Sequence, residues 1–241
     1  MIMNLLSRRS ALAAVSALLL VACGDNSGAT GGQTAAVSQG DHVIGSADAP
    51  VTVIEYASPT CPACKYFHDD ILPTLKAEYI DTGKVRFVYR EYPVHQDLDV
   101  PAYALALCAG EDKFFDVLDD LFERQDNVIG AAQNGALKMA LQTIGKRHGI
   151  ETDAQFDACM SNRDYRQVLA DKYQVATEKW NVTSTPSFII DGKTHRFEGR
   201  TRTAESFSEY LDELLAKAAP AEAAAPAEDT TDAAAPEQTE Q

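Results

Sequence analysis

Hydrophobic residues along the chain follow two periods, one typical of strands and one typical of helices. Residues 49–58 form a short run rich in β-branched side chains, which predicts a buried strand. Residues 63–80 have apolar positions at helical spacing, with a kink expected at Pro73 because proline lacks a backbone N–H. Residues 85–94 show the alternation of a second strand. This strand–helix–strand order implies a right-handed parallel crossover.

Helical periodicity dominates the middle of the chain. Apolar residues in 114–122 recur at spacings of three and four, so they share one face of an amphipathic helix. Thr152 and Gln155 have the spacing of a capping box at the start of another helix. A third apolar stripe covers residues 169–180. We therefore expect a helical insertion at about residues 98–178.

Strand patterns return after this insertion. Residues 186–190 and 194–197 flank Asp191 and Gly192, a pair of residues typical of a hairpin turn. Apolar positions in residues 207–215 then predict a last amphipathic helix. The whole order is β-α-β, helices, β-β-α, which predicts an α/β protein with a thioredoxin-like fold and a helical insertion.

Composition limits the classes of function and divides the chain. The 241 residues include 45% hydrophobic residues, which excludes a wholly disordered chain, and the net charge of −15 disfavours nucleic acid as a partner. Residues 1–22 have the layout of a secretory signal, with arginines ahead of a short apolar run. Residues 23–40 predict a flexible linker, and residues 218–241, rich in Ala, Pro and Glu, predict a disordered tail. The folded domain is expected at residues 41–217.

The end of the signal segment offers a membrane anchor. Residues 20–23, "LVAC", resemble a bacterial lipobox, in which Cys23 would be lipidated. An ordinary cleaved signal is the alternative. Residues 7–12, "SRRSAL", also resemble a twin-arginine signal, although Ala11 replaces the usual bulky residue, so the export route is left open. We expect a periplasmic or other extracytoplasmic protein that is anchored to a membrane through Cys23.

Export changes the meaning of the other four cysteines. Thiols outside the cytosol tend to pair, and an even number suggests two disulfides. Cys108 and Cys159 lie on predicted helices of the insertion, and we predict a structural disulfide between them. Two buried free thiols are the alternative. Cys61 and Cys64 are separated by two residues and form the second pair.

The spacing of Cys61 and Cys64 is compatible with zinc binding, a structural staple or redox chemistry. Zinc would need two more ligands, and the remaining cysteines and the scattered histidines lack the required grouping. A staple across two residues would close a small, strained ring. Cys61 is expected at a helix N-terminus, where backbone N–H groups and the helix dipole stabilise a thiolate. Redox chemistry is therefore favoured, with no metal or cofactor.

Four segments together resemble the DsbA-type thiol:disulfide oxidoreductases, in a branch of exported or lipid-anchored proteins. The resemblance covers about residues 41–217 and lies in "GSADAPVTVIEYASPTCPACKYFH", "FVYREYPVH", "ALALCAGEDKFFDVLDDLF" and "WNVTSTPSFIIDGK". It implies that Cys61 is the nucleophile and Cys64 the resolving cysteine. Strong oxidants of the family have histidine where this chain has Ala63, so we expect a higher Cys61 pKa and a milder oxidant.

The resemblance also suggests roles for residues outside the cysteine pair. An acid at the position of Glu55 assists proton transfer at the buried cysteine, although a strand-end carboxylate reaching solvent is the alternative. Thr185 and Pro186 match the cis-proline segment that pairs with substrate. Threonine before this proline also occurs in isomerases, which leaves oxidase and isomerase open. His68 and His95 lie near these motifs and are assigned no role.

The leading functional hypothesis is an enzyme that introduces disulfides into reduced exported proteins. The resemblance implies reoxidation by a membrane quinone-linked thiol oxidase. A disulfide isomerase or reductase is an alternative, although residues 24–40 are too short and polar for the dimerisation module of such isomerases, so we expect a monomer. A thiol-based metal- or client-binding lipoprotein is a third reading, and the four methionines and five histidines form no run that would favour copper.

Overall fold

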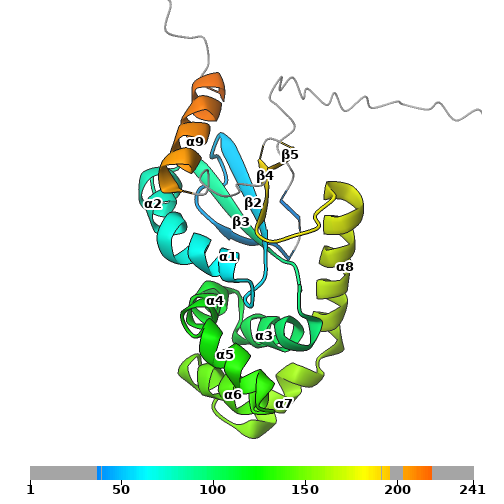
Figure 1. Cartoon of the computed structure of the whole chain (residues 1–241). Helices are drawn as coiled ribbons and strands as arrows, with labels where there is room; N and C mark the ends of the chain where they lie inside the picture. Colours follow the sequence, from blue (N-terminus) through cyan, green and yellow to red (C-terminus); the bar gives the residue numbers. More distant parts are fainter. Residues whose placement is uncertain (1–36, 39, 191, 196–202, 219–241) are drawn as a thin grey trace, which may run out of the picture. The chain divides into compact units, whose positions relative to one another are not determined.

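The computed structural model describes residues 37–38, 40–190, 192–195 and 203–218 (Figure 1). The expected signal segment with Cys23, most of the linker, and all but the first residue of the expected acidic tail lie outside these ranges. Within them, no helix has both the length and the apolar character needed to cross a membrane.

Strands in the described part of the chain form one five-stranded sheet in the order β1-β3-β2-β4-β5. The central pair, β2 and β3, is parallel, and the other pairs are antiparallel. The strands are β1 (His42–Ile44), β2 (Val51–Ala57), β3 (Val85–Glu91), β4 (Ser187–Ile190) and β5 (Lys193–His195). The parallel crossover and the β4–β5 hairpin expected from the sequence are confirmed, while Asp191 of the hairpin lies outside the described residues. Strand β1 was not predicted.

Helices surround this sheet and fill the connection between β3 and β4. They are α1 (Pro62–Tyr66), the π-helical η1 (Phe67–Ile71), α2 (Leu72–Leu75), the π-helical η2 (Lys76–Ile80), α3 (Gln96–Ala109), the 3₁₀-helical η3 (Glu111–Lys113), α4 (Phe114–Glu123), α5 (Gln125–Gln133), α6 (Leu137–Arg147), α7 (Asp153–Ser161), α8 (Arg163–Trp180) and α9 (Ala204–Ala218). The helix after the cysteine pair departs from α geometry at Phe67, ahead of the kink expected at Pro73. A π turn at this point changes the hydrogen-bond pattern of the helix where the proline cannot donate a backbone N–H.

Both faces of the sheet are covered, so the two sets of side chains that alternate along β2 and β3 enter two different cores. On one face, residues such as Val53 and Phe87 join the larger core with the helices after the cysteine pair. On the other face, Ile54 and Val88 pack with Ala176 and with other residues of the segment around α8. Figure 1 shows α8 on one side of the sheet and α1, α2 and α9 on the other. Burial on both faces explains why most residues of β2 are apolar.

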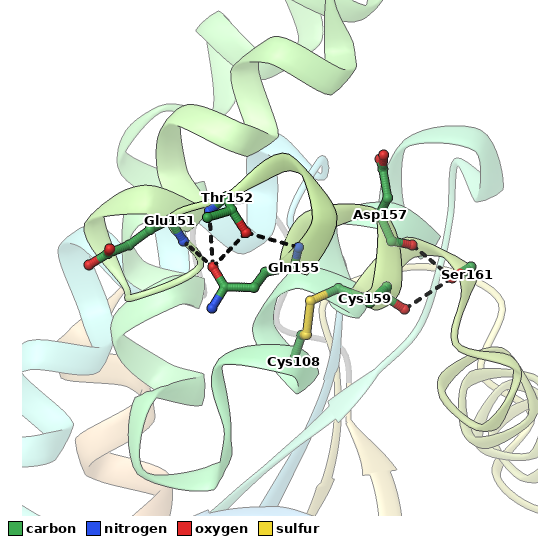
Figure 2. Close-up of a disulfide and its surroundings, with 8 residues drawn as sticks. Cys108, Glu151, Thr152, Gln155, Asp157, Cys159 and Ser161 are labelled. Carbon is green, nitrogen blue, oxygen red and sulfur yellow. Dashed lines mark hydrogen bonds between the residues drawn. A yellow bond between two sulfur atoms is a disulfide. The ribbon is translucent and has the colours of Figure 1, made fainter.

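The insertion is closed by a disulfide between its first and fifth α-helices. Cys108 on α3 and Cys159 on α7 are bonded, 51 residues apart in sequence (Figure 2). Helix α7 starts with the capping box predicted from the sequence, in which the Thr152 hydroxyl accepts from the N–H of Gln155 and the Gln155 side chain accepts from the N–H of Thr152. This cap fixes the start of the helix that holds one of the two bonded cysteines.

Candidate active site

Cys61 occupies the N-cap of α1, directly after the loop that follows β2. Pro62 takes the first helical position, where its missing N–H costs nothing. The backbone N–H groups of Ala63 and Cys64 face the Cys61 sulfur. Cys61 is half-buried, whereas the Cys64 side chain, one turn further along, is completely buried. Both are free thiols in this structure.

The two thiols have opposite ionisation properties. The hydrogen bond from the Cys64 thiol lowers the pKa of Cys61 from 9.0 to about 6. The backbone N–H groups add to this lowering, and partial burial opposes it. Burial raises the pKa of Cys64 well above its usual value, and the Cys61 hydrogen bond and the charge of Glu55 add to this rise. At neutral pH the outer sulfur is therefore a thiolate and the inner sulfur keeps its proton, which is the division that thiol–disulfide exchange requires.

The segment before β4 lies against the outer sulfur. Cys61 Sγ is 3.4 Å from the backbone oxygen of Thr185, although the two residues are 124 positions apart in sequence. The peptide bond between Thr185 and Pro186 is cis. The fold thus brings together the cysteine and the Thr-Pro pair that the sequence analysis selected.

Glu55 is completely buried on β2, so the alternative of a carboxylate reaching solvent is wrong. Its Oε2 atom lies 2.8 Å from Nε2 of His68, which is also buried. No role for His68 was predicted from the sequence. Its spacing of four residues from Cys64 and seven from Cys61 was the available signal, because those spacings place it on the same face of a helix as the two cysteines.

A second buried carboxylate holds the loop that leads to the cysteine pair. Asp99, on α3, has no exposed surface and accepts hydrogen bonds from the hydroxyls of Ser58 and Thr60 at 2.8 and 2.7 Å. It also accepts the backbone N–H groups of Val94 and His95 at 2.7 and 2.8 Å. Charge-assisted hydrogen bonds of this kind are among the stronger ones in proteins, so Asp99 fixes the conformation of this loop. Asp99 was not predicted from the sequence as a residue of the site.

The helical insertion contributes a further contact to the loop. The side-chain amide of Gln125, on α5, donates to the backbone oxygens of Pro59 and Cys61 at 2.8 and 3.1 Å. Lys65 follows Cys64 directly, and its ammonium group donates to the backbone oxygen of Phe122 at 2.7 Å and pairs with Asp69 at 2.7 Å.

Metal binding has little support in this arrangement. Cys108 and Cys159 are bonded to each other and so are not available as ligands beside Cys61 and Cys64. Within the ranges that the structure describes, no three or more His, Cys, Asp or Glu side chains are grouped to hold a metal ion.

Comparisons with known proteins agree with this geometry. The family described as "Thioredoxin" matches residues 37–213. The crystal structure of Wolbachia pipientis alpha-DsbA1 has a TM-score of 0.66 and 25% sequence identity, covering 76% of this chain and 94% of that one. A Bacillus anthracis relative named "Probable disulfide bond formation protein D" is 36% identical over 154 residues, which are 62% of this chain and 69% of the relative.

A Rickettsia bellii relative named "Putative protein-disulfide oxidoreductase" is 34% identical over 157 residues, 65% of this chain. The match spans 59% of that relative, less than two thirds of its length. The chain belongs to the thioredoxin family and has its fold. Within that family, the likeness to alpha-DsbA1 and to the disulfide bond formation protein places it with the DsbA-type proteins.

Proposed function

We propose that the chain is an extracytoplasmic thiol:disulfide oxidoreductase that introduces disulfides into reduced exported proteins. The observation that supports this most directly is the division between the two thiols: Cys61 has a pKa of about 6 and contacts Thr185, whereas Cys64 is buried and its pKa is raised. A lowered thiol pKa means that the thiolate of the reduced protein is stabilised. This stabilisation makes the disulfide form a better oxidant.

The cycle starts with the Cys61–Cys64 disulfide. A substrate thiolate attacks Cys61 Sγ, the bond between the two cysteines breaks, and Cys64 leaves with the electron pair and takes a proton. Glu55, whose charge acts on Cys64, is the residue proposed to pass this proton to it. A second substrate thiolate then attacks the substrate sulfur of the mixed disulfide, and Cys61 leaves as a stabilised thiolate. The substrate gains a disulfide and the protein ends with two thiols.

The Thr185–Pro186 segment is the proposed substrate-binding element. An extended peptide carrying the reactive thiol would pair with the backbone next to Thr185, beside Cys61. Reoxidation would be performed by a membrane quinone-linked thiol oxidase. The Cys108–Cys159 disulfide is proposed to be structural, and a lipid on Cys23 is proposed to keep the folded domain, residues 41–217, at a membrane.

The enzymatic proposal is tested by mixing the oxidised protein with a reduced, unfolded substrate and measuring substrate disulfides over time. We expect rapid oxidation by the wild type, none above background by Cys61→Ser, and near-wild-type rates at 25 °C by Cys108→Ser/Cys159→Ser. Full activity of Cys61→Ser would contradict the proposal. Faster reshuffling of a scrambled substrate than oxidation of a reduced one would favour the isomerase alternative, which the threonine before Pro186 keeps open.

The anchor is tested in a bacterial host by metabolic labelling with a radioactive fatty acid. We expect label on the wild type, in the membrane fraction, and no label on Cys23→Ala. An unlabelled wild type would show that the signal is an ordinary cleaved one.

A further inference from the structure

Glu55 and His68 form a buried acid–base pair behind the cysteines. The side chains are 0% and 3% exposed, and His68 Nε2 lies 2.8 Å from Glu55 Oε2. A buried carboxylate is costly unless it is hydrogen-bonded. An imidazole can supply that hydrogen bond, and it can also gain and lose a proton near neutral pH. The pair therefore has the chemistry to move a proton as well as to satisfy Glu55.

Aromatic rings fix the orientation of the imidazole. It stacks on the ring of Phe122, with centroids 4.3 Å apart, and meets the edges of Phe67 and Tyr89 at 5.6 and 5.7 Å. Rings on three sides restrict rotation of the imidazole, so Nε2 remains directed at the carboxylate.

One atom of each side chain has no hydrogen bond. Glu55 Oε1 and His68 Nδ1 are buried and, among the residues that the structure describes, no partner contacts them. Buried polar atoms are normally satisfied, and exceptions often mark a redox or catalytic role. The free oxygen leaves Glu55 able to exchange a proton with a second group while it remains bonded to His68.

Electrostatic coupling extends from this pair in two directions. On one side, the charge of Glu55 contributes to the raised pKa of Cys64. On the other side, partial burial raises the pKa of Asp119, on α4, and His68 opposes that rise. Electrostatic interactions thus link four groups one after another: Cys64, Glu55, His68 and Asp119. Asp119, the last of them, lies at the surface.

We propose that His68 is a positioning residue for proton transfer at Cys64, acting through Glu55. The inference rests on the proposed function. When the Cys61–Cys64 bond breaks, the electron pair goes to Cys64 Sγ, and one proton moves from His68 Nε2 to Glu55 and on from Glu55 to that sulfur. Oxidation of the two thiols reverses these transfers.

Other titratable groups near the pair bear on any pH measurement. From the elements packed around His68 they are Glu55 on β2, Cys64 on α1, Tyr89 on β3, Asp69 on η1, and Asp116 and Asp119 on α4. A change confined to the imidazole is therefore needed, and His68→Gln keeps a polar group of similar length without a titrating one.

The test separates the two chemical steps of oxidation. The reduced protein is mixed with excess oxidised glutathione, quenched with acid at set times, and analysed by intact mass. Formation of the glutathione adduct reports attack by Cys61, and its decay to the internal disulfide reports attack by Cys64. We expect His68→Gln to form the adduct within about twofold of the wild-type rate. We expect adduct decay to slow by roughly 100-fold and lose its wild-type pH profile.

A matched control and a double variant exclude a merely structural effect. His148 pairs with Asp120 at 3.1 Å, outside the site, and His148→Gln should decay like the wild type. In a Glu55→Gln background, adding His68→Gln should slow decay no further, because His68 acts through Glu55. Equal slowing in both backgrounds, or unchanged decay in the single variant, would overturn the inference.

A second measurement uses only the wild-type protein. Nitrogen-15 spectra of the histidine rings at pH 7 should show a different chemical shift of His68 Nε2 in the oxidised and reduced wild type, and identical shifts would overturn the inference. Failure of the proposed function is distinct, because in that case the wild type itself would form no adduct at Cys61.

Discussion

The two cysteine pairs of this chain show how the surroundings decide what the same side chain does. Cys61 and Cys64 lie within one helical turn, with the first sulfur at the helix start and beside the Thr185 backbone. Cys108 and Cys159 lie on different helices, 51 residues apart in sequence, and link α3 to α7. The first pair is placed so that one sulfur can ionise and meet another molecule. The second is placed so that two helices stay together.

The largest expected effect distinguishes the roles of the two cysteines in the first pair, Cys61 and Cys64. Cys64→Ala removes the proposed resolving thiol but keeps Cys61 at the helix start, so incubation with a disulfide-containing peptide should accumulate a covalent adduct at Cys61. Cys61→Ala should form none at pH 7, because burial keeps Cys64 protonated and out of reach. Mass spectrometry of the mixtures measures the adducts. Equal labelling of the two variants would contradict the division of roles.

The second pair should affect stability instead of activity. Closing a loop of 51 residues stabilises the fold by about 4 kcal/mol in the chain-entropy model. The variant Cys108→Ser/Cys159→Ser should lose about this much free energy of unfolding, measured in urea. Its catalysed oxidation rate at 25 °C should stay near that of the wild type. A large loss of activity in the folded variant would show that the disulfide also controls the site.

The pH dependence of stability should distinguish the reduced from the oxidised protein. In the reduced fold the pKa of Cys61 is lowered from 9.0 to about 6. Ionisation therefore favours the folded state fully above pH 9, and this contribution is lost as pH falls through about 6. The free energy of unfolding of the reduced form, minus that of the oxidised form, should therefore decrease as the pH is lowered from 9.0 to about 6. Urea titrations at several pH values measure this difference. A flat difference would show that Cys61 ionises alike in the folded and unfolded chains.

The smallest expected effect concerns the cap of α7. Thr152→Ala removes one hydrogen bond of the capping box and should lower the free energy of unfolding by about 1 kcal/mol, without changing the oxidation rate. Thr143→Ala is a matched control, because its hydroxyl is exposed and bonds only within its own helix among the described contacts. An equal loss in both variants would show that the cap adds nothing specific.

Features with a local pattern could be predicted from the sequence. The strand before Cys61, the hairpin around Gly192 and the capping box at Thr152 each depend on residues close together in the chain, and all are present. The likeness of four separate segments to one family then supplied the fold.

Features that depend on distant partners could not be predicted in the same way. Strand β1 has three residues and exists through its pairing with β3. Asp99 looks like an ordinary helical acid until the fold brings it to Thr60, 39 positions away. His68 has a helical spacing from the cysteines, but its partner Glu55 lies on a strand. These contacts depend on burial and on residues that are distant in the sequence, and local periodicity carries no signal of either.

The Gln125 amide, which links α5 to the loop around Cys61, has a consequence for engineering. Because the two carbonyl groups that it satisfies belong to the loop around Cys61, excising the inserted helices to obtain a minimal thioredoxin would remove that support. A shortened version would therefore need a substitute donor for these two carbonyl groups to keep the loop around Cys61 in the same conformation.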